Sequence, residues 1–211
     1  MNGAPALIVL AKAPVAGRVK TRLCPPCTPA EAAQLAAAAL ADTLAAVAAT
    51  PGVTRRLLVL DGVAGPWVPP GFAVLPQRGG GLDERLACAF ADVGGPALLV
   101  GMDTPQVTPA LLRDGLDRLA RTGAVLGLAP DGGYWAIGLQ RASAALFHGV
   151  PMSATDTGGA QLRRLHDQGL QVDLLPELRD VDTIADAHAV AAACPPGAAF
   201  PAALDRTLIT A

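Results

Sequence analysis

Short apolar runs alternate along the chain with longer segments of helical periodicity. The short runs have the length of β-strands: Ala6–Leu10, Arg56–Leu60, Phe72–Leu75, Ala97–Val100, Ala124–Leu128, Tyr134–Leu139 and Gln171–Leu175. This alternation predicts an α/β fold with a mostly parallel sheet covered on both faces, a three-layer α/β/α arrangement. A short D-G-G turn precedes Tyr134–Leu139 and is too short for a parallel crossover, so this strand is expected to run antiparallel to the one before it.

Helix signals fill most of the longer intervals. Thr28-Pro29 followed by Glu31 predicts a helix start, and Pro51-Gly52 predicts its end. Leucine spacing after Leu82 and the cap Thr108-Pro109 predict two more helices. Further helices are expected over Thr157–Gln168 and Thr183–Ala193, with a weaker helical signal past Pro201.

Length and composition narrow the class of protein. The 211 residues fit one domain, 1–211, and the net charge of −2 gives no global basic field for nucleic acid. Hydrophobic residues make up 52% of the chain, but many are alanine, and no uninterrupted apolar run approaches the roughly 20 residues that span a bilayer. We therefore expect a cytoplasmic protein without a membrane span; a homodimer is left open.

The four cysteines do not make a disulfide framework in a chain of this type, which is expected to be cytoplasmic. Cys24 and Cys27 have C-x-x-C spacing just before a predicted helix, but no second pair or histidine partner lies nearby. An incidental pair is the favoured interpretation, with redox or metal chemistry as the alternative.

The strongest candidate for binding is the basic loop that follows the first strand. In a parallel α/β sheet, ligands bind outside the carboxyl ends of the strands, and this loop begins at such an end. Gly17 would allow close backbone approach to a phosphate, and an extended segment would aim its alternating cations one way. Candidate nucleotide-binding residues here are Ala11, Lys12, Gly17, Arg18, Lys20 and Arg22. The loop has neither a Walker A frame nor a dinucleotide fingerprint; the alternative is a solvated basic turn.

Two further loops are expected at the same edge of the sheet. Asp103 follows the strand Ala97–Val100, where a carboxylate typically holds a divalent cation that bridges phosphate oxygens. Asp131 follows the strand Ala124–Leu128 and is a candidate catalytic residue or simply a turn residue. Candidate substrate contacts beside it are Gly132, Gly133, Tyr134 and Trp135. Strand alternation places the two aromatic rings on opposite faces, so at most one is expected to stack on a ligand.

Two other strand ends offer polar residues. Asp180 and Asp182 follow the last strand and would project to one side if extended. Asp182 is a candidate metal ligand and catalytic residue; a helix N-cap is the alternative. Gln77, Arg78 and Gly80 end the third strand and are candidates for the wall of the nucleotide site; the triple glycine there could also be a flexible turn.

Four ordered motifs together resemble one family. They are A-K-A-P-V-A-G-R-V-K-T-R-L, G-M-D-T-P, D-G-G-Y-W-A-I-G-L and L-R-D-V-D-T. In order and spacing they resemble a bacterial family of glycosyltransferase-A-like proteins, described as uncharacterised or as candidate glycosyltransferases, some linked to arsenosugar synthesis. The resemblance covers roughly residues 6–187, and the family is similar to phospholactate and molybdenum-cofactor guanylyltransferases. This sequence departs from the family pattern at Met102 and Thr104, where members often carry serine or cysteine. It also departs at the acceptor-side segment around Thr155.

The resemblance implies a nucleotide-diphospho-sugar transferase (GT-A) fold. It implies that the basic loop holds nucleotide phosphates, that Asp103 holds Mg²⁺ or Mn²⁺, and that Asp131 or Asp182 completes the metal or acceptor site. The expected partners are a nucleotide-sugar or nucleoside triphosphate and an unidentified small acceptor, whose site includes Thr155. Glycosyl transfer is favoured by the family's usual description, and nucleotidyl transfer with pyrophosphate release is the alternative. A non-catalytic nucleotide-binding module is a third.

Overall fold

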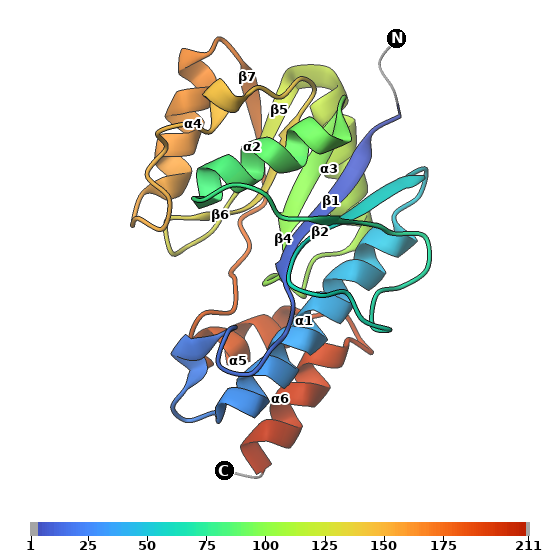
Figure 1. Cartoon of the computed structure of the whole chain (residues 1–211), viewed down its shortest axis with the longest axis vertical. Helices are drawn as coiled ribbons and strands as arrows, with labels where there is room; N and C mark the ends of the chain where they lie inside the picture. The colour runs from blue at the N-terminus through green and yellow to red at the C-terminus, as the bar shows by residue number, and fades with distance from the viewer. Residues whose placement is uncertain (1–3, 210–211) are drawn as a thin grey trace.

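A seven-stranded sheet forms the centre of the computed structural model, which describes residues 4–209 and the side chains of 4–207. The strands are β1 (Ala6–Lys12), β2 (Arg55–Asp61), β3 (Ala73–Pro76), β4 (Ala97–Gly101), β5 (Gly123–Leu128), β6 (Tyr134–Leu139) and β7 (Gln171–Leu175). Their order across the sheet is β3-β2-β1-β4-β6-β5-β7 (Figure 1). Each of the seven predicted strands is confirmed, with ends that differ by at most two residues.

The direction of the strands decides where the functional loops lie. β6 pairs antiparallel with both β4 and β5, whereas the other neighbouring strands pair in parallel. Two antiparallel pairings in succession leave β5 and β7 running the same way as β1, β2, β3 and β4. All six parallel strands therefore end at one edge of the sheet, which we call the rim, and the predicted antiparallel strand is confirmed.

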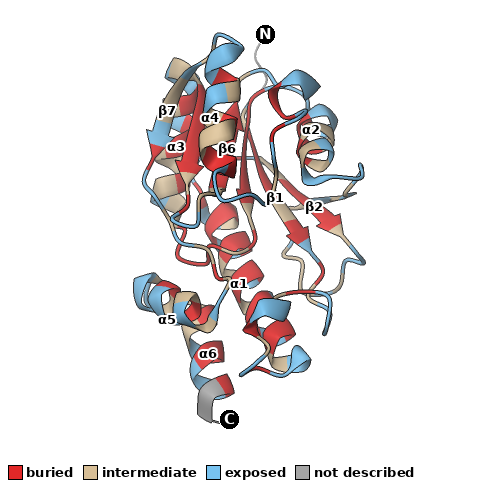
Figure 2. Ribbon diagram, turned by 90° about the vertical axis from the view of Figure 1, so that its left-hand side faces the viewer, coloured by how far each residue is buried: buried red, intermediate tan, exposed pale blue. Residues whose placement is uncertain are grey.

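Helices cover both faces, as expected for three layers. They are α1 (Pro29–Ala49), α2 (Leu82–Val93), α3 (Pro109–Thr122), α4 (Thr157–Asp167), α5 (Ile184–Ala193) and α6 (Ala199–Ile209), with 3-10 turns η1 (Thr21–Leu23) and η2 (Ala144–Leu146). One face of the sheet packs with α1 and α3, and the other packs with α2, η2 and α4. The buried residues concentrate in the strands and on the inner helix faces (Figure 2).

α1 is long because its sequence specifies both ends. Thr28 and Glu31 form a capping box, Pro29 occupies the first turn, and Thr50-Pro51 ends the helix. At 21 residues, with a mean hydropathy of 1.5, α1 is long and apolar enough to cross a membrane by length and composition, which the expectation from uninterrupted apolar runs did not register. More than half of its most apolar window is buried inside the protein, so core packing accounts for its hydrophobicity.

A third apolar cluster lies beyond the sheet, where α5 and α6 pack beside the projecting end of α1 (Figure 1). We call it the C-terminal core; its fully or nearly fully buried members include Leu23, Leu35, Val181, Val190 and Phe200. Leu23 follows the basic loop and Val181 lies between Asp180 and Asp182, so this cluster anchors two segments of the rim.

Gly132 joins the turn between β5 and β6 to the segment before α4. Its φ is +89°, and a Cβ there would lie 1.9 Å from the carbonyl oxygen of Thr155. The Gly158 N–H donates to the Gly132 carbonyl at 2.7 Å, which holds the two segments in contact. Only glycine satisfies both the left-handed backbone and the lack of space.

We expect Gly132→Ala to destabilise the protein more than Gly123→Ala, its matched control. Gly123 has a φ of +92° but nothing within 4 Å of an added Cβ, so it isolates the backbone cost of about 1 kcal/mol. The clash at Gly132 should add about 2 kcal/mol. Urea unfolding measures both free energies, and equal losses in the two variants would contradict the close packing.

Candidate functional site

Backbone pairing brings the loop after β4 against the segment after β7. The Val181 N–H donates to the Asp103 carbonyl at 3.0 Å, and Gln106 Nε2 donates to the Arg179 carbonyl at 2.6 Å. The G-M-D-T-P and R-D-V-D-T motifs, far apart in sequence, therefore lie side by side. The carboxylates of Asp103 and Asp182 project from the paired segments.

Lys20 links these two carboxylates. Its Nζ lies 2.8 Å from Asp103 Oδ2 and 3.3 Å from Asp182 Oδ1, and only 9% of the side chain is exposed. Burial by itself would lower the pKa of the ammonium, but Asp103 and then Asp182 outweigh it and raise the pKa above its usual value. Arg22, which is 76% exposed, reaches the other oxygen of Asp182 at 2.8 Å.

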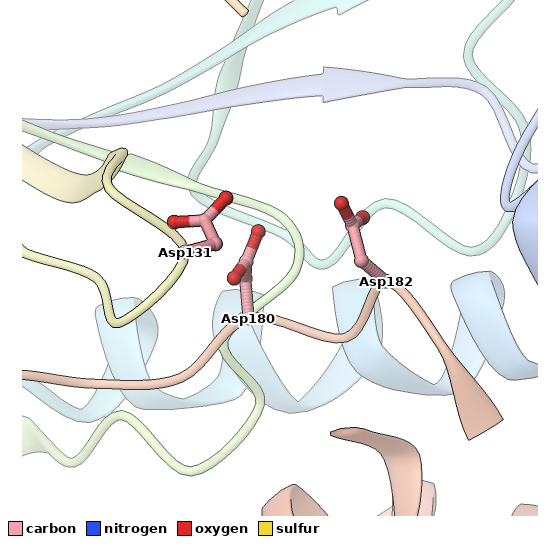
Figure 3. Close-up of side chains that lie close together, drawn as sticks. All are labelled: Asp131, Asp180 and Asp182. Carbon is pink, nitrogen blue, oxygen red and sulfur yellow. The ribbon is translucent and has the colours of Figure 1, made fainter. Parts of the chain in front are cut away.

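Asp131, Asp180 and Asp182 form an acidic group beside this ion pair. Each offers a carboxylate oxygen, and these oxygens all lie within 4.8 Å of one another. Figure 3 shows the side chains of Asp131 and Asp180 adjacent, with Asp182 next to them from the same segment as Asp180. Partial burial, followed by the charges of Asp131 and Asp182, raises the pKa of Asp180 to about 6. The group concentrates negative charge at the rim.

Asp182 is not a helix N-cap. Thr183 caps α5 through a box with Asp186, in which Asp186 N donates to Thr183 Oγ1 at 3.2 Å. That alternative for Asp182 is therefore wrong, because the hydroxyl one residue later takes the role. The Asp182 carboxylate instead faces Lys20 and Arg22.

The basic loop is not extended, so the expected common direction of its cations is wrong. Residues 16–18 form a turn, Lys20 has a left-handed backbone with φ 49°, and η1 follows at once. Lys20 and Arg22 face the carboxylates, whereas Arg18 lines a separate cleft of about 210 Å³. Lys12 lies in the same cleft, together with Ala13, Val15, Asp61, Gly62 and Val63.

The other predicted residues of the basic loop have distinct places. Ala11 is buried, and its carbonyl accepts a hydrogen bond from Gln77 Nε2 at 2.7 Å. Gly17 is exposed with φ +76° and nothing within 4 Å of an added Cβ, so backbone approach is open there. The rim thus keeps Lys12, Gly17 and Arg18 accessible.

The predicted nucleotide-binding residues after β3, which are Gln77, Arg78 and Gly80, contact other parts of the protein. The Gln77 amide also donates to the Val59 carbonyl at 3.2 Å, so this side chain ties β1 to β2. Arg78 pairs with Asp92 of α2, and the Gly80 N–H donates to Glu84 at 2.7 Å. A role in nucleotide binding for these three residues remains a prediction. For Arg78 that role requires the guanidinium to leave Asp92 and contact the nucleotide instead.

Of the two aromatic residues predicted to contact substrate, Trp135 lies in the core and Tyr134 is partly buried. Trp135 is 3% exposed, and its indole N–H donates to the Pro176 carbonyl at 3.1 Å, which leaves no free face at the rim. Tyr134 packs on the opposite face of the sheet, as alternation predicts, and burial raises its pKa. Gly133 donates its N–H to Asp131 Oδ1 at 2.8 Å, and the exposed Thr155 contacts the Gly132 position. The rim therefore includes Asp131, Gly132, Gly133 and Thr155, whereas the Trp135 ring is enclosed. A substrate contact of Tyr134 stays a prediction.

Two residues near the candidate site, Gln106 and Asp61, were not predicted from the sequence. Gln106, 7% exposed, positions the segment that carries Asp180 and Asp182. Asp61 is the last residue of β2 and lies beside Lys12. A polar residue at the carboxyl end of a strand was the sequence signal that could have identified it as a candidate site residue.

The four cysteines are free thiols. Cys27, Cys24 and Cys194 all contact the C-terminal core. Burial, followed by Asp42, raises the pKa of Cys194 to about 11, and burial, followed by Glu31 and Cys24, raises the pKa of Cys27. Raised pKa values disfavour the reactive thiolate at neutral pH, which supports the incidental interpretation.

The donor set fits a divalent cation of the magnesium type. Carboxylate oxygens are the ligands that Mg²⁺ and Mn²⁺ prefer, and Asp103 Oδ1 is buried without a hydrogen-bond partner. Asp103 and Asp182 could hold the cation, with Asp180 or Asp131 beside them.

We expect Asp180→Asn to stabilise the metal-free protein at high pH. Because the folded-state pKa is raised to about 6 from 3.8, ionisation of Asp180 opposes folding above pH 6 and ceases to matter below about pH 4. With partial exposure taken into account, the gain should be about 1–2 kcal/mol at pH 8.

Urea unfolding in EDTA across pH 4–8 measures this gain, with Asp167→Asn on the exposed end of α4 as control. A gain of equal size at pH 4 and pH 8 would show that charge at Asp180 is not its cause.

Solved structures resemble this fold. A Desulfovibrio desulfuricans G20 protein described as a candidate nucleotide-diphospho-sugar transferase matches with a TM-score of 0.87 and 24% identity over 99% of this chain and 96% of its own. CMP:2-keto-3-deoxy-manno-octonic acid synthetase in complex with CTP matches with a TM-score of 0.55 and 11% identity, over 89% and 97% of the two chains. The 2-C-methyl-D-erythritol 4-phosphate cytidylyltransferase of Thermus thermophilus matches with 0.53 and 18%, over 96% and 99%.

These similarities show the fold, and the expected fold of the nucleotide-diphospho-sugar transferase type is confirmed. No curated protein matches the sequence. The relations to arsenosugar-type and guanylyltransferase proteins stay predictions. Residues 31–154, more than half of the chain, match the family described as "Uncharacterized protein conserved in bacteria (DUF2064)", and the chain belongs to that family.

Proposed function

We propose that this protein is a metal-dependent transferase that moves a glycosyl group from a nucleotide-sugar to a small acceptor. The observation that carries the proposal is the convergence at one rim of an acidic group, the Lys20–Asp103–Asp182 ion pair and the open basic loop. We propose further that residues 1–211 act as one domain, of which 1–3 and 210–211 lie outside the described residues.

The basic side of the rim suits the phosphates of the donor. Lys12 and Arg18 line the cleft, and Gly17 leaves the neighbouring backbone open to an oxyanion. Charge-assisted hydrogen bonds from lysine and arginine suit diphosphate oxygens. As the bond to the leaving nucleoside diphosphate breaks, these cations stabilise the negative charge that develops on it.

The acidic side suits the metal and the acceptor. Asp103 and Asp182 would hold Mg²⁺ or Mn²⁺, which when bound supplies Lewis-acid stabilisation of the phosphate oxygens. Asp131 is exposed beside Asp180, near the exposed Thr155. It could accept the proton of an acceptor hydroxyl that binds between these loops.

Nucleotidyl transfer is the second candidate. The G-M-D-T-P segment carries a single aspartate, Asp103, rather than a D-x-D pair. This arrangement favours a reaction in which an acceptor attacks the α-phosphorus and pyrophosphate leaves. Two of the proteins with the same fold are named for cytidylyl transfer or bind CTP, which supports keeping this candidate.

Incubation with Mg²⁺ or Mn²⁺ and a panel of nucleotide-sugars and nucleoside triphosphates tests the proposal. We expect thermal stabilisation by nucleotide-sugars and release of a nucleoside diphosphate, detected by ion-exchange chromatography. Pyrophosphate release from a triphosphate would favour the second candidate. Stabilisation by nucleotide without any turnover would support a non-catalytic module, and absence of stabilisation by every nucleotide would overturn all three.

For the turnover found in that panel, we expect Asp103→Asn to lower kcat about 100-fold or more, since Asp103 is proposed to hold the metal that stabilises the negative charge developing on the phosphates. Asp117→Asn is the matched control, because this exposed carboxylate pairs with Arg113 on the outer side of α3. Activity of the Asp103 variant within a few-fold of the control would refute the role of Asp103.

A further inference from the structure

Lys20 lies where a cation shared by Asp103 and Asp182 must lie. Its Nζ contacts Asp103 Oδ2 at 2.8 Å and Asp182 Oδ1 at 3.3 Å, so one ammonium bridges carboxylates from two loops. A divalent cation bound by the same two oxygens would lie about 2.0–2.6 Å from each. The ammonium and the metal therefore exclude one another from this position.

We propose that Lys20 is a tethered substitute for the metal, which a divalent cation must displace before the site is complete. This inference rests on the proposed function, because it takes Asp103 and Asp182 as metal ligands. Displacement transfers the ammonium from the carboxylates to the open part of the rim, where donor phosphates are expected. Metal binding and phosphate binding are thereby coupled through a single side chain.

The charges of the rim favour this exchange. Asp103, Asp131, Asp180 and Asp182 supply four carboxyl groups, and Lys20 and Arg22 are the cations paired with them in the described residues. Without Lys20, the carboxylates would repel one another across a partly buried space. The ammonium therefore keeps the loops together in the absence of metal, and a divalent cation supplies twice its charge.

The backbone supports the same role. Lys20 and Ser153 are the two non-glycine residues with positive φ among residues 4–209, and Lys20 has φ 49° and ψ 37°. A left-handed lysine costs conformational energy that its contacts must offset. Leu23, three residues later, is fully buried in the C-terminal core and fixes the loop from the other side. The loop is thus held with its ammonium on the carboxylates.

Arg22 differs in a way that provides a control. It also pairs with Asp182, at 2.8 Å, but it is 76% exposed and has no ion pair with Asp103 within the described part of the chain. Removal of its charge changes the local electrostatic potential without vacating the position between the two carboxylates.

The wild-type protein allows a direct test, because Lys12 and Lys20 are its two lysines. We expect acetic anhydride to label Lys20 slowly without metal, since the ammonium is buried and held between two carboxylates. Mg²⁺ alone should increase the labelling rate of Lys20 by about tenfold, as loss of a charge-assisted pair implies. The exposed Lys12 is the internal control and should change little; peptide mass spectrometry measures both rates. Unchanged protection of Lys20 in saturating Mg²⁺ would overturn the proposal.

Mn²⁺ affinity without nucleotide, measured from the electron paramagnetic resonance signal of free Mn²⁺, provides a second test. We expect Lys20→Met to bind Mn²⁺ about tenfold more tightly than wild type, Arg22→Met to gain less, and Lys20→Arg to gain nothing. A gain in Lys20→Met no larger than in Arg22→Met would reject displacement. Asp103→Asn in the same assay separates the two proposals. Undiminished Mn²⁺ binding in this variant would refute Asp103 as a metal ligand and with it the proposed site of Asp103 and Asp182. Loss of Mn²⁺ binding in Asp103→Asn, together with unchanged affinity in Lys20→Met, would refute only the exchange.

Discussion

The antiparallel insertion of β6 between β4 and β5 is the constraint on which the site depends. The chain reaches β5 from β4 through α3, and β5 and β7 run in the same direction as β1, so the carboxyl ends of all six parallel strands meet at one edge. β6 turns back from that edge through the loop of Asp131 and fills the position between β4 and β5. The loop of Asp131 and the segment of Asp180 and Asp182 therefore lie at the edge that carries Asp103, although tens of positions separate these residues in sequence.

The rim separates opposite charges into two adjoining regions. Lys12 and Arg18 line the open cleft beside Val15 and Val63, whereas the carboxylates gather where the loops of β4, β5 and β7 meet. Lys20 belongs to the basic loop by sequence but lies among the carboxylates in space. A ligand that combines phosphates with a metal would neutralise both regions at once, which is the electrostatic basis for an activated nucleotide as the donor.

Much of the fold could be predicted, because apolar periodicity, capping residues and turn lengths are local signals. The seven strands, the capping boundary at Thr28 and the antiparallel direction of β6 all follow from residues close in sequence. The basic loop could not be predicted in the same way. Its left-handed Lys20 is held by carboxylates up to 162 positions away, so alternation within Arg18–Arg22 gave the wrong side-chain directions.

The candidate site residues also fall into two groups, those with local sequence signals and those that depend on contacts distant in sequence. Asp103 and Asp131 could be placed at the rim because each follows a recognisable strand. The burial of Trp135 and the internal bonds of Gln77 could not be foreseen, since both depend on partners from other strands and on the segment after β7. Gln106 escaped notice for the same reason: its significance lies in the Arg179 carbonyl that it binds.

Through the C-terminal core, α5 and α6 support the candidate site although they lie beyond the sheet. Val181 and Leu23, which flank the acidic and basic groups of the rim, are buried in the same apolar cluster as Phe200 of α6. The helix at the end of the chain therefore acts as a foundation for the ion pair rather than as an appendage. A change in the length or packing of α6 would alter the distance between the cations of the basic loop and the carboxylates of the rim. Evolution could therefore adjust the geometry of the site through α6 without replacing any residue that contacts a ligand.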